Sequence, residues 1–555
     1  LFRSGTPEAP VSLFIGGAWR TGSAGTRDVI DPATERPMGV VTLATDAEID
    51  AAIAAADAAF GAWRAKPALE RGAILIGAAT LIRERSERIA RLLTLEQGKT
   101  LAESRGEIAR AVETFAWNGE EAPRIEGAVV AGRAPGSTRR RVAAPLGVVA
   151  AFDAWNFPAV LAARKLGAAL AAGCTVVLKA AEEAPYTAAA IVACLDEAGL
   201  PKGVVNLVFG DPPAVAKRLL ASPVVRKVTF TGSTRIGKEL AALAAPDLKR
   251  CIFELGGHAP VILCADGHVD AAVAATIPFK FTSAGQSCIA PSRFYIHRSR
   301  YQEFIDKFTA VARNLKTGDG LEPDTKMGPV ANGRRRQAMS RYTEDAKVQG
   351  AAILCGGERL NRAGFFWSPT VLADVPDKAA VMNEEPFGPV APMAAFDDLD
   401  EAIHRANRLP YGFAAYGFTA DLRTAERLAD RLEAGKIGIN QMCPSVFLNV
   451  LTVASRSAEV SLSIMAATMS PFSTCESRRT TTMSPSVIAT SIIESPTTLS
   501  AMRSPSPTSC LGSGMMSSRT SSARRGPPAA IRPTSGTRAT AGPAESPTAR
   551  SPCSA

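Results

Sequence analysis

From residue 145, for about 100 residues, the sequence alternates short β-branched runs with alanine-rich segments of helical character. The expected strands are Gly147–Phe152, Thr175–Leu178, Val204–Val208 and Lys227–Phe230, and the expected helices are Pro158–Ala172, Thr187–Ala198, Pro213–Ser222 and one from Thr234. Continuous apolar strands separated by helices predict a parallel sheet with helices on both faces. Ligands bind such sheets at the carboxyl ends of the strands.

A second α/β stretch is predicted from Ile252 to about Asn440. Its expected elements are the strands Pro260–Cys264, Arg293–His297 and Val390–Phe396 and the helices Tyr301–Leu315 and Leu399–Arg408. Upstream, Thr45 followed by Glu48 is a capping-box pattern that predicts the start of a helix. Helical patterning then continues to about Gly119, and we interpret this region as a packing layer. The predicted fold class is therefore α/β with two lobes.

The basic charge of the chain, +10 in total, is concentrated at its end. Residues 451–555 hold ten Arg, four Glu and neither Lys nor Asp, a net charge of +6. They also hold 24 Ser, 15 Thr and 11 Pro, with one Phe and neither Tyr nor Trp. Such a composition buries too little apolar surface to offset the ordering entropy, so we predict a disordered tail. Because aromatic residues do not alternate with the arginines and the segment contains no known nucleic-acid-binding module, a nucleic-acid-binding role is not expected.

The ten cysteines show no C-x-x-C pair and no closely spaced histidines, and the chain has only four His. This pattern argues against a zinc site and against a disulfide framework, so no metal is expected. Free thiols suit a reducing cytoplasm. No apolar run reaches the length of about 18 residues that a membrane-spanning helix needs, and no signal-peptide core follows Phe2. We predict a cytoplasmic protein without a membrane partner.

Two motifs could bind a dinucleotide, although each also has a purely structural interpretation. The turn at residues 230–237 follows a strand and opens a helix, so its free N–H groups could hold a pyrophosphate. Its G-x-x-x-x-G spacing is not the usual G-x-G-x-x-G, and such turns are often structural. Lys179 and Glu182 follow another strand and could bind ribose hydroxyls, or they could form a solvated charge cluster.

Three further residues could carry out chemistry. Cys288 follows Gly285–Gln286–Ser287, but a buried thiol is usually inert packing. Glu254 ends a strand beside two glycines, where a carboxylate is more often a turn or capping residue. Asn156 precedes a helix that starts with proline, and it could simply belong to the N-cap region of that helix.

The order and spacing of these motifs resolve the ambiguity that each has singly. Over residues 13–446 the chain resembles the aldehyde dehydrogenase superfamily. The shared motifs are W-N-F-P, L-K-x-x-E, F-T-G-S-T-x-x-G, E-L-G-G, G-Q-S-C and the N-E-E-P-F-G-P segment at 383–389. The resemblance implies a Rossmann-type NAD-binding domain (1–123 and 144–251), an oligomerisation hairpin (124–143) and a catalytic domain (252–446). Residues 447–555 lie outside the resemblance.

The resemblance also implies the catalytic roles. Cys288 would attack the aldehyde carbon as a thiolate. Asn156, together with the backbone N–H of Cys288, would stabilise the oxyanion that forms. Glu254 would activate the water that hydrolyses the thioester. We expect this carboxylate to stay away from the thiolate during acylation, because their like charges repel each other.

The cofactor implied by the resemblance is NAD. Its binding residues would be Lys179 and Glu182 for the adenosine ribose, Gly232 and Ser233 for the pyrophosphate, Glu385 for the nicotinamide ribose, and the aromatic residues Trp155 and Phe387. A carboxylate at Glu182 would accept from a 2′-hydroxyl and repel a 2′-phosphate, so NADP is expected to bind less well.

The implied substrate is a small aldehyde. Beyond these motifs, the sequence is most similar to succinate-semialdehyde and 2-oxoglutarate-semialdehyde dehydrogenases. In those enzymes an Arg at the position of Arg164 can bind the distal carboxylate of the substrate. Those relatives often carry a second Arg six residues before the nucleophile, where this chain has Thr282. Those relatives form homodimers or homotetramers, and the resemblance implies the same for this chain. The assembly of the relatives also uses a final C-terminal strand, which this chain does not share.

The C-terminal region departs from the family pattern. After Ile437 the family continues with a P-F-G-G-x-K-x-S-G segment and a final strand, and from Phe447 onward this chain has neither. The change of composition is typical of translation in another reading frame, and a natural disordered extension is the alternative. The main prediction is therefore an active NAD-dependent semialdehyde dehydrogenase, and the alternative is an inactive or unstable relative.

Overall fold

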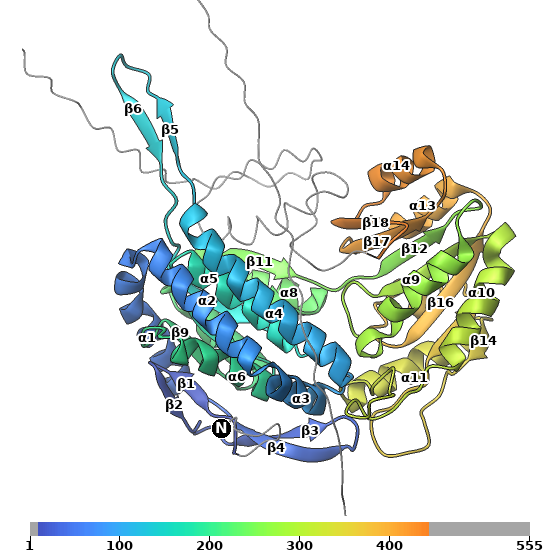
Figure 1. Cartoon of the computed structure of the whole chain (residues 1–555), viewed down its shortest axis with the longest axis horizontal. Coiled ribbons are helices and arrows are strands. Elements are labelled where there is room, and N and C mark those ends of the chain that lie inside the picture. Colours follow the sequence, from blue (N-terminus) through green and yellow to red (C-terminus); the bar gives the residue numbers. More distant parts are fainter. Residues whose placement is uncertain (1–8, 443–555) are drawn as a thin grey trace, which may run out of the picture. The chain divides into compact units, whose positions relative to one another are not determined.

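The computed structural model of the chain describes residues 9–442, which form two seven-stranded sheets and two two-stranded ribbons (Figure 1). The predicted tail at 447–555, and the last family-like residues before it, lie outside the described residues.

The first sheet has the strand order β11-β10-β7-β8-β9-β1-β2. Its strands are β1 Leu13–Ile15, β2 Ala18–Arg20, β7 Val148–Phe152, β8 Thr175–Lys179, β9 Val205–Val208, β10 Val225–Thr231 and β11 Arg250–Glu254. The five strands from β11 to β9 are parallel, whereas β1 pairs antiparallel with β9 and β2. The four predicted strands are all present, with bounds that differ by at most two residues.

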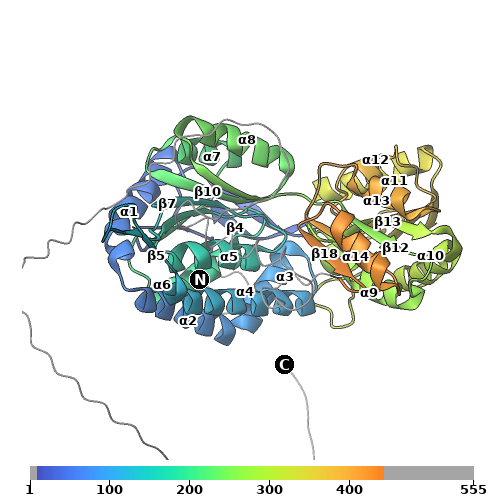
Figure 2. The same cartoon turned by 90° about the horizontal axis from the view of Figure 1, so that it is seen from above.

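Helices cover both faces of this sheet, as predicted, with α7 and α8 on one face and α5 and α6 on the other (Figure 2). They are α5 Pro158–Ala171, α6 Pro185–Glu197, α7 Pro212–Ala221 and α8 Thr234–Ala244. Proline stands in the first turn of α5, α6 and α7, where its fixed φ favours the helix and its missing N–H costs nothing. The strand-to-helix turns are therefore encoded locally.

Four helices precede these units in the chain, namely α1 Asp46–Ala65, α2 Ala68–Glu84, α3 Ser86–Gln97 and α4 Leu101–Glu121. Helices α2 to α4 pack as an outer layer on α5 and α6, whereas α1 packs on the sheet itself, against β8 and β9 and beside α7. The capping box predicted at Thr45 and Glu48 is present. A second one starts α4, where Thr100 and Glu103 cap each other. The antiparallel ribbon β3 Thr26–Asp31 and β4 Arg36–Thr42 lies before this layer in the chain.

The second sheet has the order β14-β15-β16-β13-β12-β17-β18. Its strands are β12 Ala259–Leu263, β13 Pro291–His297, β14 Ala352–Cys355, β15 Thr370–Ala373, β16 Val390–Phe396, β17 Ala414–Phe418 and β18 Lys436–Ile439. All pairs are parallel except that of β14 with β15. Its helices are α9 Val269–Phe281, α10 Arg298–Arg313, α11 Gly333–Val348, α12 Ala380–Asn383, α13 Leu399–Asn407 and α14 Leu422–Arg431.

Side chains alternate between two apolar cores across this second sheet. Phe294 and Ile296 of β13 join the core formed with α9 and α10, and Tyr295 between them joins the core formed with α11, α13 and α14. This alternation is the period-two pattern of a strand that is buried on both faces. The three strands predicted in this region are confirmed.

Strands β5 Ala128–Ala131 and β6 Thr138–Arg141 form an antiparallel ribbon apart from both sheets (Figure 1). It falls within the predicted hairpin at 124–143, and Val129 and Val142 are each about 70% exposed on it. Its role in assembly stays a prediction. Among the helices of residues 9–442, none combines the length and the apolarity that crossing a membrane requires.

Candidate active site

A cavity of about 890 Å³ is lined by residues of both sheets. It gathers nine of the eleven residues predicted from the sequence, namely Trp155, Asn156, Arg164, Gly232, Ser233, Glu254, Cys288, Glu385 and Phe387. The chain passes from β11 of the first sheet to β12 of the second between Glu254 and Ala259, next to this cavity. Lys179 and Glu182 do not line it.

Cys288 lies opposite Glu254 in the cavity. Its thiol donates to Glu254 Oε1 across 3.7 Å, a distance typical of a weak hydrogen bond to sulfur. Burial raises the pKa of the Cys288 thiol well above its usual value, and the carboxylates of Glu254 and Glu385 raise it further, whereas Arg164 and Lys436 act in the opposite direction. The thiol is therefore protonated at rest, and Glu254 is placed to receive its proton. The expected separation of Glu254 from the thiolate concerns acylation and stays a prediction, because the neutral thiol at this contact carries no charge to repel the carboxylate.

Glu254 also faces cationic and hydroxyl groups. Its Oε1 lies 3.7 Å from a guanidinium nitrogen of Arg164, and its Oε2 accepts a long hydrogen bond, 3.4 Å, from the Thr231 hydroxyl. Lys165 donates to that same hydroxyl across 2.7 Å and lies 2.9 Å from the buried Asp153. A polar path thus runs from the cavity to the interior of the first sheet.

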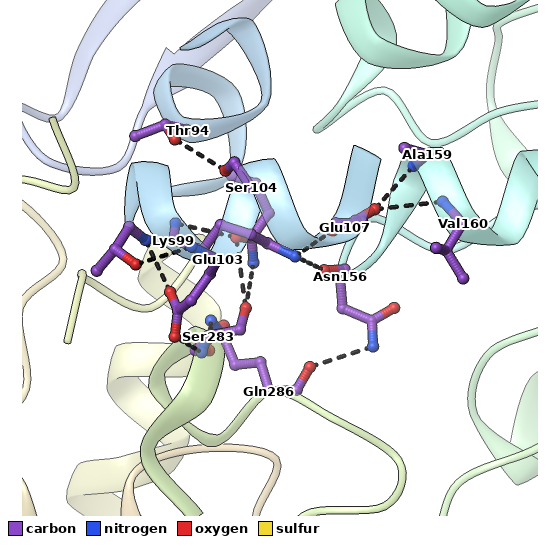
Figure 3. Close-up of polar contacts among 12 residues, drawn as sticks. Thr94, Lys99, Glu103, Ser104, Glu107, Asn156, Ala159, Val160, Ser283 and Gln286 are labelled. Carbon is purple, nitrogen blue, oxygen red and sulfur yellow. Dashed lines mark hydrogen bonds and ion pairs between the residues drawn. The ribbon is translucent and has the colours of Figure 1, made fainter. Parts of the chain in front are cut away.

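The amide of Asn156 is fixed beside the nucleophile. Asn156 lies just before α5, is 5% exposed, and donates from Nδ2 to the backbone oxygen of Gln286 across 3.1 Å (Figure 3). Gln286 in turn accepts at Oε1 from the backbone N–H of Ala331, at 2.9 Å. Asn156 lines the cavity together with Cys288, so its amide can serve an oxygen that forms at the reacting carbon.

The two glycines after Glu254 permit a close approach of backbone and side chains. A Cβ on Gly256 would lie 2.5 Å from Glu385 Oε2, and a Cβ on Gly257 would lie 2.2 Å from the backbone oxygen of Cys288. The N–H of Gly257 donates to Glu385 Oε1 across 3.0 Å. Burial raises the pKa of Glu385 to about 7 despite this hydrogen bond. The E-L-G-G motif therefore holds this second carboxylate against the nucleophile segment.

An aromatic pair forms another part of the cavity wall. The rings of Trp155 and Phe387 meet edge to face, with centroids 5.6 Å apart. The guanidinium of Arg335 lies over the Phe387 ring. Phe387 has a φ of +44°, a conformation that non-glycine residues rarely adopt. Such strain persists only where the surrounding structure holds it, and it often marks a functional site.

The glycine turn after β10 faces the same cavity, so the N-terminus of α8 opens into it. Ser233 caps α8 by accepting from the N–H of Ile236, and residues 231–235 all line the cavity. A Cβ on Gly232 would lie 2.4 Å from the ring of Phe230, so only glycine fits this turn without rearrangement. The N-terminus of an 11-residue helix is a favourable place for a phosphate.

Lys179 and Glu182 lie at the carboxyl end of β8. Lys179 Nζ contacts Glu182 Oε2 at 2.7 Å, and Glu182 Oε1 accepts from the N–H of Gly210 across 3.0 Å. Both side chains are almost completely buried, at 6% and 3% exposure. They are therefore an internal ion pair and not the solvated cluster that the sequence left open. The charge of Glu182 is held near a strand end, and both of its carboxylate oxygens are engaged within the protein.

The sequence did not predict five cationic residues that line the cavity, namely Arg110, Arg235, Arg334, Arg335 and Lys436. Of these, Arg110 lies on α4 and Lys436 at the start of β18. None of the hydrogen bonds or ion pairs found within residues 9–442 involves the guanidinium of Arg110, which is half-buried. The predicted packing layer thus contributes to the site. In the same part of the chain, no three His, Cys, Asp or Glu side chains are grouped as a metal site would need.

Comparison with known proteins decides the family. The sequence profile described as the aldehyde dehydrogenase family matches residues 19–450 of this chain. The chain belongs to the aldehyde dehydrogenase family. It is accordingly an NAD(P)-dependent enzyme that oxidises an aldehyde to the acid, and the α/β fold expected for that family is confirmed.

Three relatives bear on the substrate and the cofactor. A putative 4-(hydroxymethyl)benzenesulfonate dehydrogenase of Comamonas testosteroni is 48% identical, over 78% of this chain and 91% of its own length. An NADP(+) succinate-semialdehyde dehydrogenase of Escherichia coli is 41% identical, over 77% of this chain and 89% of its own. The crystal structure of succinate-semialdehyde dehydrogenase from Burkholderia pseudomallei matches with a TM-score of 0.77 at 41% identity, over 78% and 90% of the two chains.

Proposed function

We propose that this aldehyde dehydrogenase uses NAD to oxidise a small aldehyde that carries a distal anion, with succinate semialdehyde as the substrate we favour. The observation that carries the proposal is the placement of Arg164 and Arg110 on the wall of the cavity that holds Cys288. An arginine guanidinium binds a carboxylate through two parallel hydrogen bonds, which gives both energy and orientation. The two relatives compared in sequence are named for substrates that carry a sulfonate or a carboxylate.

In the proposed acylation, Cys288 loses its proton to Glu254 and attacks the aldehyde carbon. The oxygen of the resulting thiohemiacetal accepts from the Asn156 amide and from the backbone N–H of Cys288. A nicotinamide held beside Trp155, Phe387 and Glu385 would supply the acceptor for the hydride that leaves this carbon, and Cys288 would then carry a thioester. In the proposed deacylation, Glu254, after it has passed the Cys288 proton to solvent, removes a proton from a water molecule that attacks the thioester carbon. The C–S bond breaks, the Cys288 sulfur takes this proton from Glu254, and the acid is released.

The residues fit a dinucleotide. The α8 N-terminus and the space left by Gly232 suit a pyrophosphate, Glu385 suits the nicotinamide ribose, and Trp155 and Phe387 supply apolar walls. The buried pair of Lys179 and Glu182 suits the adenosine ribose. Because the carboxylate of Glu182 would repel a 2′-phosphate, we propose NAD as the preferred cofactor.

The alternative of an inactive relative is not proposed. The residues given catalytic roles all lie within residues 9–442, and the cavity gathers them. The sequence that motivated this alternative, after residue 446, lies outside the described residues.

The direct test is the formation of reduced cofactor by the full chain. We expect turnover with succinate semialdehyde and NAD, and a kcat/KM about 10-fold or more above that for butanal, which lacks the carboxylate. NADP should give a lower kcat/KM than NAD. A folded protein without turnover on succinate semialdehyde, 4-formylbenzenesulfonate or butanal would refute the proposal. A higher kcat/KM for 4-formylbenzenesulfonate than for succinate semialdehyde would support the anion site, with a sulfonate and not a carboxylate as its ligand.

Arg110 offers a selective test of the anion site, because it contacts neither Glu254 nor Cys288. We expect Arg110→Met to lower kcat/KM for succinate semialdehyde by about 10-fold, the range of one charge-assisted hydrogen bond. The value for butanal should change less than about 3-fold. Arg105→Met on the same helix is the matched control, since Arg105 is exposed and pairs with Glu87. Equal losses with both aldehydes would contradict an anion-binding role.

A further inference from the structure

A buried ion pair lies next to the backbone of Asn156, the residue whose side-chain amide faces the cavity. Lys99, just before α4, and Glu107, within α4, contact each other at 2.5 Å between Nζ and Oε2 (Figure 3). Both side chains have no exposed surface. Burying two charges is costly, and apolar side chains of similar volume usually pack as well. The pair therefore calls for an explanation beyond packing.

Lys99 connects this pair to the backbone of Asn156. Its Nζ donates to the Asn156 carbonyl oxygen across 2.7 Å and lies 3.8 Å from the ring centre of Phe157. The ammonium thus contacts the two residues that carry the chain from the amide into α5. A shift of Asn156 along the backbone would break a charge-assisted hydrogen bond.

Glu107 fixes the same segment from the other side. Helix α5 starts without a side-chain cap from its own N-terminal residues. Glu107 Oε1 supplies that cap from α4, accepting from the N–H of Ala159 at 2.9 Å and more weakly from that of Val160 at 3.4 Å. A carboxylate at a helix N-terminus also interacts favourably with the helix dipole. The pair therefore holds residues 156–160 at both the carbonyl and the N–H groups.

The same helix junction also holds the segment that leads to Cys288. Glu103 Oε1 accepts from the N–H of Ser283 at 2.9 Å (Figure 3). Gln97 Nε2 donates to the Ser283 hydroxyl at 3.1 Å. Ser283 and Ala284 have φ values of +50° and +52°, left-handed conformations that the surroundings must maintain. The nucleophile segment and the amide thus share one support.

We propose that the Lys99–Glu107 ion pair positions Asn156 for the oxyanion, so that these two residues are positioning residues for acylation although they do not line the cavity. The inference rests on the proposed function, in which Asn156 donates to the oxyanion. The Asn156 side chain makes one hydrogen bond within residues 9–442, to Gln286, so its direction depends on where its backbone is held. Oxyanion donors act through their exact placement, since the stabilisation falls steeply with distance and angle.

The test is a double-mutant cycle between the ion pair and Asn156, read as the single-turnover rate of reduced NAD formation with enzyme in excess. Lys99→Met/Glu107→Gln removes both charges together, so that neither is left buried alone. We expect this variant to react about 10-fold or more slowly at full amplitude, and Asn156→Ala to react about 10²-fold more slowly. Combined with Asn156→Ala, the pair substitution should slow the reaction by less than about 2-fold further.

Amplitude and rate separate positioning from folding. A merely structural defect lowers the amplitude, which counts active sites, whereas a displaced oxyanion donor lowers the rate. Ser104→Ala is the matched control, because Ser104 hydrogen bonds to Thr94 in the same buried layer and contacts neither Asn156 nor Ser283 (Figure 3). It should keep the wild-type rate. If the double variant does not fold, Glu107→Gln alone, which keeps an oxygen for Ala159, enters the same cycle.

An equal loss from the pair substitution with and without Asn156 would overturn the inference while leaving the proposed function intact. An Asn156→Ala variant with the wild-type rate would instead refute the oxyanion role of Asn156, which is a failure of the proposed function.

Discussion

Replacing Cys288 by alanine is expected to abolish aldehyde oxidation, with kcat reduced by about 10⁴-fold or more. Cys288 is the one cysteine among the described residues that line the cavity, and a thiol is a far better nucleophile than the neighbouring hydroxyls, so its loss removes a whole pathway and not one contact. The effect should be the same for succinate semialdehyde and butanal, because the thiol meets the aldehyde group that both share. The measurement is reduced-cofactor formation in steady state and in a single turnover.

A second cysteine provides the control for this result. Cys251 is an exposed free thiol on β11, three residues before Glu254. Cys251→Ala should keep kcat and KM within about 2-fold, as surface substitutions usually do. Cys288→Ala should still bind NAD, because the substitution does not change the glycine turn or the N-terminus of α8. Protein fluorescence would measure this binding. Residual turnover above about 1% in Cys288→Ala would show that the nucleophile is elsewhere.

The parts of the site that follow strands could be predicted from the sequence, and the reason is physical. Periodicity locates where each parallel strand ends, and in a doubly covered sheet those ends face one edge. Glu254 and the turn at Gly232 were found in this way, and the family resemblance then assigned their roles. Arg164 depended on the resemblance alone, because a single arginine in an apolar helix has no periodic signal.

The contributions of the outer helices could not be predicted. Lys99 meets Asn156, 57 residues away, and Glu107 meets Ala159, 52 residues away, and no local pattern encodes such contacts. The position of Arg110 could not be predicted either. On a helix of mixed polarity such as α4, the sequence pattern does not distinguish an arginine that faces the cavity from one that faces solvent. The contact of Cys288 with Glu254 was not predicted for another reason. The sequence analysis considered only the charged thiolate, which would repel the carboxylate, whereas the raised pKa of Cys288 favours the neutral thiol, which can donate to it.

Glu254→Gln is expected to separate the two half-reactions. The amide cannot remove a proton from water, so the thioester on Cys288 should persist and steady-state turnover should fall by about 10²- to 10⁴-fold. One equivalent of reduced cofactor per site should still form, and mass spectrometry of the protein should show the acyl group. Added hydroxylamine, which needs no general base to attack a thioester, should restore turnover. Glu303→Gln on α10, an exposed carboxylate paired with Lys307, is the matched control and should behave as wild type.

The size of the first turnover in Glu254→Gln then discriminates between the two tasks that the geometry allows. Glu254 lies 3.7 Å from the Cys288 thiol, so it could be needed for deprotonating the nucleophile as well as for activating water. If the burst keeps its amplitude and only slows, the carboxylate assists acylation, and raising the pH should recover the burst rate because it raises the thiolate fraction. If the burst keeps both its rate and its amplitude, Glu254 acts only in deacylation. If steady-state turnover of Glu254→Gln stays within about 2-fold of wild type, or if no acyl group accumulates after a full burst, the assignment of Glu254 as the deacylation base is wrong.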